Sequence, residues 1–272
     1  MKHWSWRSAV SCAVVSAAAG VVLVAGQAND PRPKLPPFVA GPPPGMKNPP
    51  RPVTPPKAPS GVRTPPPSAP SRVEKLSEST LRIGAIYVDL AKKEMVVPGT
   101  INDVMVLEFL LNTKSGYKSY ESAIEADCTA LDFNVALVLI GLDEERSSAR
   151  PRFHFDPVTP QGDGVEMSVA WRTAAGERRV KIEELIYNEG NKQTLPAGHW
   201  VYTGPRFMPN SKALMADVDG VLVGFVHTPA TLIERAEAVP GPYGNAKLNP
   251  TLGLNPGTPV LVTIKALPPA AR

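Results

Sequence analysis

Residues 165–171 read Val-Glu-Met-Ser-Val-Ala-Trp and indicate the class of the fold, because apolar side chains alternate with polar or small ones. Successive side chains of a β-strand point to opposite faces, so this period of two predicts a strand with one buried face. Alternating or β-branched-rich runs recur at residues 83–89, 94–97, 104–112, 180–187, 200–204, 213–217, 221–227 and 260–266. Asp219-Gly220, between two of these runs, predicts a type I′ hairpin. The sequence therefore predicts a mainly β (α+β) domain with a mostly antiparallel sheet over residues 72–268.

One long apolar segment departs from this pattern. Residues 131–142 read Leu-Asp-Phe-Asn-Val-Ala-Leu-Val-Leu-Ile-Gly-Leu, a nearly all-apolar run that ends at Gly141. With Asp132 as its N-cap, this run predicts a buried helix. A second, short helix is expected at residues 229–237. The predicted sheet domain thus has one buried helix and one short helix.

A proline-rich segment precedes the predicted domain. Of the 32 prolines, 17 lie between Pro31 and Pro70. Proline lacks a backbone N–H and fixes φ, so residues 29–71 cannot build a helix or a sheet and favour polyproline II. We expect this segment to be a disordered, semi-rigid linker that separates residues 1–28 from the domain at residues 72–268.

The first 28 residues have the composition of an export signal. Lys2 and Arg7 precede residues 9–25, which carry no charge and are almost wholly small or apolar. Gly26-Gln27-Ala28 then provides the small residues that signal-peptide cleavage before Asn29 requires. The alternative is that this segment stays uncleaved as an N-terminal membrane anchor. Both interpretations export residues 29–272, so we expect a periplasmic or extracellular domain, anchored to the cytoplasmic membrane in the second case.

Charge is distributed unevenly along the chain. The net charge is +4, but residues 31–70 contain six basic residues and no acidic one, whereas residues 71–272 contain 21 basic and 24 acidic residues. The domain is therefore mildly acidic. A nucleic-acid surface, which needs clustered Lys and Arg, is not expected there. The basic linker is suited to contact anionic envelope polymers or a membrane surface.

The cysteines and the missing motifs exclude several kinds of chemistry. Cys12 lies in the predicted leader and Cys128 in the domain, and there is no other cysteine. Zinc and iron–sulfur sites built on several thiolates are thereby excluded within one chain. Cys128 is either a nucleophile or a small buried residue, which is the commoner state of a free cysteine. The chain has no G-x-S-x-G, H-E-x-x-H, P-loop or G-x-G-x-x-G motif, and we expect no cofactor and no metal.

Five short motifs follow one another along the domain. They are residues 115–122 (Ser-Gly-Tyr-Lys-Ser-Tyr-Glu-Ser), 134–141 (Asn-Val-Ala-Leu-Val-Leu-Ile-Gly), 200–204 (Trp-Val-Tyr-Thr-Gly), 216–220 (Ala-Asp-Val-Asp-Gly) and 255–260 (Asn-Pro-Gly-Thr-Pro-Val). In these motifs and their order the chain resembles the YdjY-domain family of uncharacterised exported bacterial proteins, over nearly all of residues 80–266. The family has no assigned activity, so the resemblance implies a fold but no reaction.

The first of these motifs contains the main candidate site. Glu121, flanked by the hydroxyls of Tyr120 and Ser122 and close to Lys118, can orient a polar ligand or serve as a general base. In an alternating strand Tyr120 and Ser122 share one face and Glu121 takes the other. The alternative is that Glu121 caps the following turn or pairs with a lysine. We take Lys118, Tyr120 and Glu121 as candidate ligand-binding residues.

His154 and Asp156 form a second candidate. In an extended backbone the two side chains point the same way, so the carboxylate can fix the imidazole or join it as a metal ligand. A metal site needs a third ligand, which would have to be His199 or His227. The alternative is that these histidines are scattered surface or core residues. Arg206, after Gly204-Pro205, is a further candidate that can contact an anion.

Two other features each have two interpretations. The aromatic residues Trp171, Trp200, Tyr202 and Phe207 either form a floor for sugars or peptides or fill the core of the sheet. The irregular segment 240–259, rich in Pro and Gly, is either functional or covers a sheet edge. Asp217-Val218-Asp219-Gly220 does not continue as a calcium loop, because Met215 and Val226 stand where acidic ligands are needed.

Two functions fit these observations. The first is an exported, non-catalytic binding or structural module that is tethered by its proline-rich linker and binds an unknown envelope ligand or protein. The second is an envelope hydrolase or metal-dependent enzyme that uses Glu121 with His154 and Asp156. Convergence of Glu121 with a histidine in one pocket favours the enzyme. A Glu121 that is buried against its own turn, with dispersed histidines, favours the module.

Overall fold

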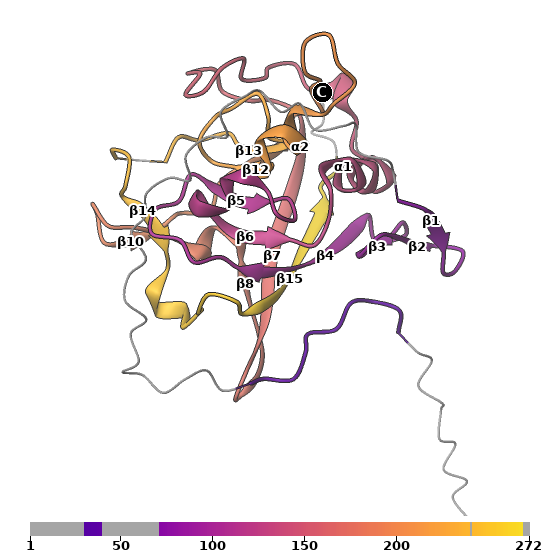
Figure 1. The fold of residues 1–272 in the computed structure, drawn as a ribbon, viewed down its shortest axis with the longest axis horizontal. Coiled ribbons are helices and arrows are strands. Elements are labelled where there is room, and N and C mark those ends of the chain that lie inside the picture. Colours follow the sequence, from indigo (N-terminus) through magenta and orange to yellow (C-terminus); the bar gives the residue numbers. More distant parts are fainter. Residues whose placement is uncertain (1–29, 40–70, 240, 269–272) are drawn as a thin grey trace, which may run out of the picture. The chain divides into compact units, whose positions relative to one another are not determined.

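The fold of residues 31–272 is known from a computed structural model that describes residues 30–39, 71–239 and 241–268 (Figure 1). Everything below concerns the described residues of the unit Pro31–Arg272. The predicted leader and residues 40–70 of the predicted linker lie outside the described residues, and residues 30–39 form neither helix nor strand. Among the described residues, no helix is long and apolar enough to cross a membrane.

Eight strands of the large sheet close into a barrel, because β6 pairs with β4 at the end of the series. In spatial order they are β4 (Glu94–Ile101), β15 (Pro259–Ala266), β7 (Asp163–Thr173), β11 (Trp200–Tyr202), β13 (Ile233–Arg235), β12 (Val221–Gly224), β5 (Phe109–Asn112) and β6 (Ser122–Ala126). The prediction of a mainly β domain is confirmed. The pairing is mixed, since β5–β6 and β12–β13 are parallel and the other pairs are antiparallel.

The remaining strands extend or flank this barrel (Figure 1). Three strands continue the sheet beyond β4: β3 (Ile86–Asp89), β2 (Thr80–Ile83) and β1 (Val73–Lys75). A further strand, β8 (Gly176–Lys181), pairs with β7. A separate sheet consists of β10 (Gln193–Thr194), β9 (Ile186–Asn188) and β14 (Ala246–Leu248). Short 3₁₀ helices connect them: η1 (Tyr117–Glu121), η2 (Glu144–Arg146), η3 (Ile182–Leu185) and η4 (Pro250–Leu252). The predicted strand 180–187 is therefore divided into β8, η3 and β9.

The alternation seen in the sequence is the alternation of the barrel wall. Along β7, Val165, Met167, Val169 and Trp171 are buried, while Glu166 between them is exposed. Val260, Val262 and Ile264 of β15 are buried in the same way, and β15 pairs with β7 on one side and β4 on the other. Burial of these apolar faces supplies the main stabilisation of the domain.

The predicted buried helix is α1 (Ala130–Leu139), which contacts β3, β12 and the second helix. Its N-cap is Thr129, whose hydroxyl accepts from the backbone N–H of Asp132 over 3.1 Å. The prediction that Asp132 is the N-cap is wrong. Its carboxylate instead accepts from the backbone N–H and the hydroxyl of Ser71, over 2.9 and 2.7 Å. The helix is apolar on several faces because the fold buries it, with Phe133, Ala136 and Leu137 fully enclosed.

The short second helix lies elsewhere in the sequence than predicted. Residues 213–217, expected as a strand, lead into α2 (Met215–Asp219), and residues 229–237, expected as a helix, form a loop and β13. Gly220 has φ 72° and ends α2, so the predicted Asp219-Gly220 hairpin is wrong. A glycine at positive φ serves a helix C-terminus as well as a type I′ turn, and short apolar runs do not distinguish a helix from a strand.

Candidate functional site

The motif at residues 117–121 forms the 3₁₀ turn η1, and the strand β6 begins only at Ser122. The hydroxyl of Ser122 donates to the backbone carbonyl of Lys118 over 2.8 Å and closes the turn. Strand alternation therefore does not apply here, and the predicted shared face of Tyr120 and Ser122 is wrong. The turn instead brings Lys118 and Glu121 together, three residues apart on one side.

Lys118 and Glu121 form a hydrogen-bonded ion pair. Glu121 is buried, whereas a quarter of the Lys118 side chain is exposed. Lys118 Nζ also donates to the hydroxyl of Tyr120 over 3.3 Å and lies 5.6 Å from the centre of its ring. Burial lowers the pKa of Lys118, but the hydrogen bond and charge of Glu121 outweigh burial and raise that pKa above its ordinary value. Lys118 therefore stays charged at neutral pH.

A second buried glutamate, Glu108, lies beside this pair. Its backbone N–H donates to the carbonyl of Glu121 over 2.9 Å, and its own carbonyl accepts from Phe225 and Val226. Glu108 is 5% exposed, and no described group donates a hydrogen bond to its carboxyl group. Burial, followed by the negative charge of Glu121, raises the pKa of Glu108 to about 7, against the opposing effect of Lys118.

Glu108 is not among the site residues predicted from the sequence. It falls within the predicted strand 104–112, of which only Phe109–Asn112 is β5. The sequence nevertheless contains a sign of this residue. Residues 106–111 read Val-Leu-Glu-Phe-Leu-Leu, so Glu108 is a single acidic residue inside an apolar run. Such a residue is rarely buried without a reason.

His154 and Asp219 complete a group that we call the Glu108 cluster: Glu108, Lys118, Glu121, His154 and Asp219. His154 Nε2 lies 3.8 Å from Glu108 Oε2. Burial and then the charge of Lys118 lower the pKa of His154, while burial raises the pKa of Asp219 at the end of α2. The cluster thus contains three carboxyl groups and one permanently charged cation.

Two glycines fix the position of Asp219 against η1. A Cβ atom at Gly220 would lie 2.6 Å from Gly116 Cα and 2.6 Å from the Tyr117 backbone nitrogen. The two backbones therefore touch where any side chain would separate them. Gly220 also accepts from Thr113 N over 3.0 Å, which ties the end of α2 to the start of the loop that carries the motif. This contact between Gly116 and Gly220 brings η1 and the end of α2, which are distant in sequence, together in the cluster.

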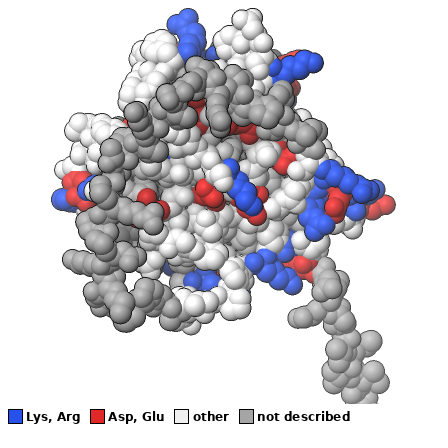
Figure 2. Space-filling model, viewed as in Figure 1, with Lys and Arg blue, Asp and Glu red and all other residues white. Residues whose placement is uncertain are grey.

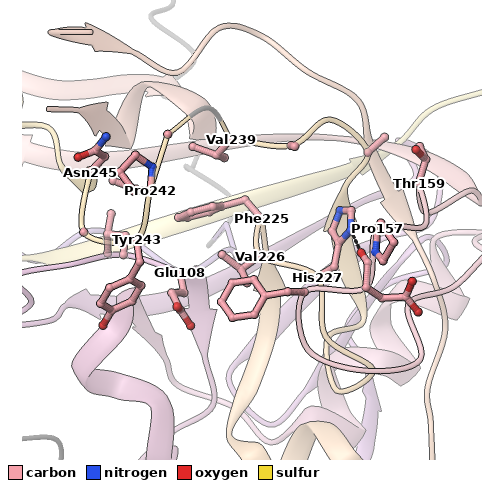
Figure 3. Close-up of a pocket in the computed structure, with 18 residues that line it drawn as sticks. Glu108, Pro157, Thr159, Phe225, Val226, His227, Val239, Pro242, Tyr243 and Asn245 are labelled. Carbon is pink, nitrogen blue, oxygen red and sulfur yellow. Dashed lines mark hydrogen bonds between the residues drawn. The ribbon is translucent and has the colours of Figure 1, made fainter. Parts of the chain in front are cut away.

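Glu108 forms part of the wall of a pocket of about 430 Å³. Figure 3 shows Glu108 and Tyr243 side by side, with the carboxyl group and the phenol oxygen pointing the same way. Phe225, Val239 and Pro242 give the pocket an apolar wall, and His227 lies toward its other end. The pocket is of the size and character that small-molecule sites have.

The sequence model of the YdjY domain matches residues 86–265. The chain belongs to the YdjY family. All five residues of the Glu108 cluster and the pocket lining lie inside the matched range. No curated protein and no solved structure matches the chain.

In this YdjY domain the second predicted site does not assemble. Phe155 has φ 61° and sits in a turn, so the backbone between His154 and Asp156 is not extended. The carboxylate of Asp156 accepts from the backbone N–H groups of Arg152 and Val158, over 2.8 and 3.1 Å, and stabilises its own loop. These hydrogen bonds lower the pKa of Asp156. His154 instead faces Glu108.

The other predicted residues of this YdjY domain are dispersed. His199 Nδ1 lies 2.5 Å from Glu237 Oε1, and His227 directs its two ring nitrogens at the carbonyl oxygens of Asp156 and Arg235. Arg206, on the loop after β11, is half-buried, and burial and then Arg150 lower its pKa. Within the described ranges, no group of three or more His, Cys, Asp or Glu side chains is placed to hold a metal ion.

The aromatic residues do not form one floor. Trp171, Trp200 and Tyr202 are buried in the core, whereas Phe207 is exposed. Cys128 is buried, and burial raises the pKa of its thiol, which is the state of a structural cysteine rather than a nucleophile. Of the segment 240–259, residues 241–246 line the pocket and β14 pairs with β9.

Proposed function

We propose that this protein is an exported, non-catalytic binding module of the YdjY family whose ligand occupies the pocket beside Glu108. The observation that carries the proposal is Glu108, a residue that is 5% exposed and lies in the wall of an apolar pocket of about 430 Å³. Its carboxyl group accepts no hydrogen bond from the described residues, and its ion-pair partner, His154 Nε2, lies 3.8 Å away. A buried carboxyl group that accepts no hydrogen bond is costly. A ligand that donates a hydrogen bond to the Glu108 carboxyl group would offset this cost.

The family motif supports the same location. Lys118, Tyr120 and Glu121, the residues expected to bind ligand, lie in one turn that hydrogen-bonds to Glu108 through Glu121. The motif thus lies directly behind Glu108, which is the residue of the Glu108 cluster that lines the pocket. Arg206 is not part of this arrangement, since its charged neighbours are Arg150, Arg152, Asp156 and Glu234.

The enzyme alternative has one observation in its favour. A carboxyl group such as Glu108, whose pKa is about 7, is suited to proton transfer at neutral pH. The proposed trio of Glu121, His154 and Asp156 is less suited, because Glu121 pairs with Lys118 and Asp156 binds its own loop. Glu121 is buried against its own turn, and His199 and His227 bind other groups, which favours binding over catalysis. His154 is the one histidine that lies in the Glu108 cluster with Glu121.

Export and tethering belong to the same proposal. They rest on the charged start and apolar run of residues 1–28 and on the proline-rich, basic composition of residues 31–70. Figure 2 shows Lys and Arg interspersed with Asp and Glu on the described surface of one face. Such a mixed surface offers little to a polyanion, so we propose that any contact with anionic envelope polymers or a membrane surface is made by the linker and not by the domain.

A pocket-filling variant tests the site. Ala238 lines the pocket from an exposed position, so Ala238→Trp fills the space with little risk to the fold. Ala175→Trp, at the exposed turn between β7 and β8, is the matched control. We expect the neutral fluorescent compound N-phenyl-1-naphthylamine to bind the unchanged protein and Ala175→Trp, and to lose most of its affinity for Ala238→Trp. Equal binding to all three proteins would place the ligand elsewhere.

A further inference from the structure

We propose that the ligand of this pocket is an amine, with a positively charged ammonium group at Glu108 and an apolar or aromatic body in the rest of the cavity. The inference rests on the proposed function, because it names the chemical class that the same pocket selects. It goes beyond that function by assigning a charge to the ligand, and the charge comes from the balance of groups around Glu108.

The Glu108 cluster has more carboxyl groups than cations. Lys118 already donates a hydrogen bond to Glu121. Lys118 also opposes the raised pKa values of Asp219 and Glu108, but burial outweighs its effect on both. The other basic group, His154, is mostly neutral at physiological pH because burial lowers the pKa of its imidazole. An ammonium group supplies the missing positive charge. A carboxylate or phosphate ligand would instead add negative charge to a cluster that already has too much.

The geometry of Glu108 points in the same direction. Glu108 is buried and lines the pocket, and its carboxyl group accepts no hydrogen bond from the described chain. An ammonium group has three N–H donors, which suit the two oxygens of Glu108 and the neighbouring phenol oxygen of Tyr243. Charge-assisted hydrogen bonds of this kind are the strong ones in protein sites.

The remainder of the pocket suits the apolar part of such a ligand. Phe155 and Tyr243 are exposed aromatic residues in its lining, and aromatic faces attract cations as well as apolar groups. The protein already uses this attraction nearby, since Lys118 Nζ lies 5.8 Å from the centre of the Phe109 ring. Phe225, Val239 and Pro242 offer no polar side chain, so the ligand body that contacts them is apolar.

This assignment makes binding depend on pH. The amine needs the ionised form of Glu108, and the groups that surround it are Glu121 and Lys118 of η1, His154, Asp219 of α2 and Tyr243. Since the pKa of Glu108 is about 7, affinity is expected to fall by roughly tenfold for each pH unit well below that value and to be level above it. A neutral alcohol of the same shape should show no such fall.

Three isosteric compounds test the inference by calorimetric titration of the purified full-length chain: 4-phenylbutylamine, 4-phenylbutanol and 5-phenylpentanoate. We expect the amine to bind at least about tenfold more tightly than the alcohol at pH 8, and the carboxylate to bind most weakly. In Glu108→Gln the amine should lose this advantage while the alcohol keeps its affinity. Glu177→Gln, which neutralises an exposed carboxylate on β8, should leave all three affinities unchanged.

The outcomes separate the two proposals. If amine and alcohol bind equally, and Ala238→Trp abolishes both, the pocket is the site but the inferred charge is wrong. Tighter binding of the carboxylate than of the amine overturns the inference in the same way. If none of the three compounds binds at millimolar concentration, or if Ala238→Trp leaves their binding unchanged, the pocket itself is not the site and both proposals fail.

Discussion

The backbone N–H of Glu108 donates to the backbone carbonyl of Glu121 over 2.9 Å, so two buried glutamates lie side by side. The reason is the parallel pairing of β5 and β6, in which Phe109 faces Ser122. The residues that directly precede these strands therefore meet at one end of the barrel wall. Parallel pairing thus brings Glu108 and Glu121 together, because each residue precedes its strand at the same end of the pair.

We predict that Glu108→Gln stabilises the protein at pH 8 and not at pH 4.5. The folded state holds the Glu108 proton up to a pKa of about 7, whereas the unfolded chain releases it near the ordinary value of 4.5. Between these values the folded state binds more protons, so stability falls as pH rises. Glutamine removes this loss, which we expect to be on the order of 1–3 kcal/mol at pH 8. Urea unfolding at both pH values measures it.

The difference between variant and parent is the quantity to compare. Glu234, whose pKa burial raises to about 8, titrates in both proteins and cancels in that difference. A Glu108→Gln chain that is less stable than its parent at pH 8 would show that Glu108 is ionised and well paired in the free protein.

Lys118→Met is predicted to destabilise the fold by roughly 3–5 kcal/mol, because it leaves the buried Glu121 carboxylate without its partner. The double variant Lys118→Met/Glu121→Gln should recover much of this loss, since no unpaired charge then remains. Lys114→Met removes an exposed partner of Asp127 and should cost far less stability. Chemical denaturation of the parent, these three variants and Glu121→Gln gives the coupling energy of the pair. Equal costs at Lys114 and Lys118 would contradict the buried pair.

Gly220→Ala should be more costly than Gly253→Ala, although both glycines end a helix with nearly the same backbone. Their φ values are 72° and 68°, so both substitutions introduce similar strain. Only at Gly220 would the new Cβ meet other backbone atoms, at 2.6 Å, whereas nothing lies within 4 Å of the Cβ at Gly253. We expect about 1 kcal/mol at Gly253 and at least about 2 kcal/mol at Gly220, measured by thermal unfolding. Similar losses at both sites would show that Gly116 and Gly220 do not touch.

The thiol of Cys128 should be unreactive in the folded protein. It is 7% exposed, and burial followed by Asp132 raises its pKa, so little thiolate is present at pH 8. In a Cys12→Ser chain, Ellman's reagent should report almost no thiol until urea is added and one thiol per chain afterwards. Full reaction under native conditions would restore Cys128 as a candidate nucleophile.

The sequence predicted the class of the fold better than its pairing. The alternation in β7 and β15 has a direct physical cause, one buried face of a strand, and this is visible in the chain. The parallel neighbours of β5 and β12 depend on long-range packing that no local pattern encodes. The predictions of secondary structure over residues 213–237 were wrong for a related reason. Leu232 and Ile233 are buried by neighbouring strands, and Gly220 ends a helix instead of forming a hairpin turn.

The sequence predicted only the part of the candidate site that lies within one motif. Lys118, Tyr120 and Glu121 are close in sequence, so their contact is local and the motif indicated it. Glu108 and Asp219 join them only through the barrel and the end of α2, which sequence spacing does not reveal. The His154–Asp156 pair required an extended backbone, and the left-handed conformation of Phe155 replaced it with a turn.

The measurement that tests the central claim most directly is an amide chemical-shift titration of the ¹⁵N-labelled full-length chain with 4-phenylbutylamine at pH 8. We predict that the largest shift changes fall on Leu107, Glu108, Tyr243 and Asn245, which line the pocket, and that β8 is unaffected. Changes confined to another surface, or no changes at millimolar amine, would contradict the assignment of the pocket beside Glu108 as the ligand site.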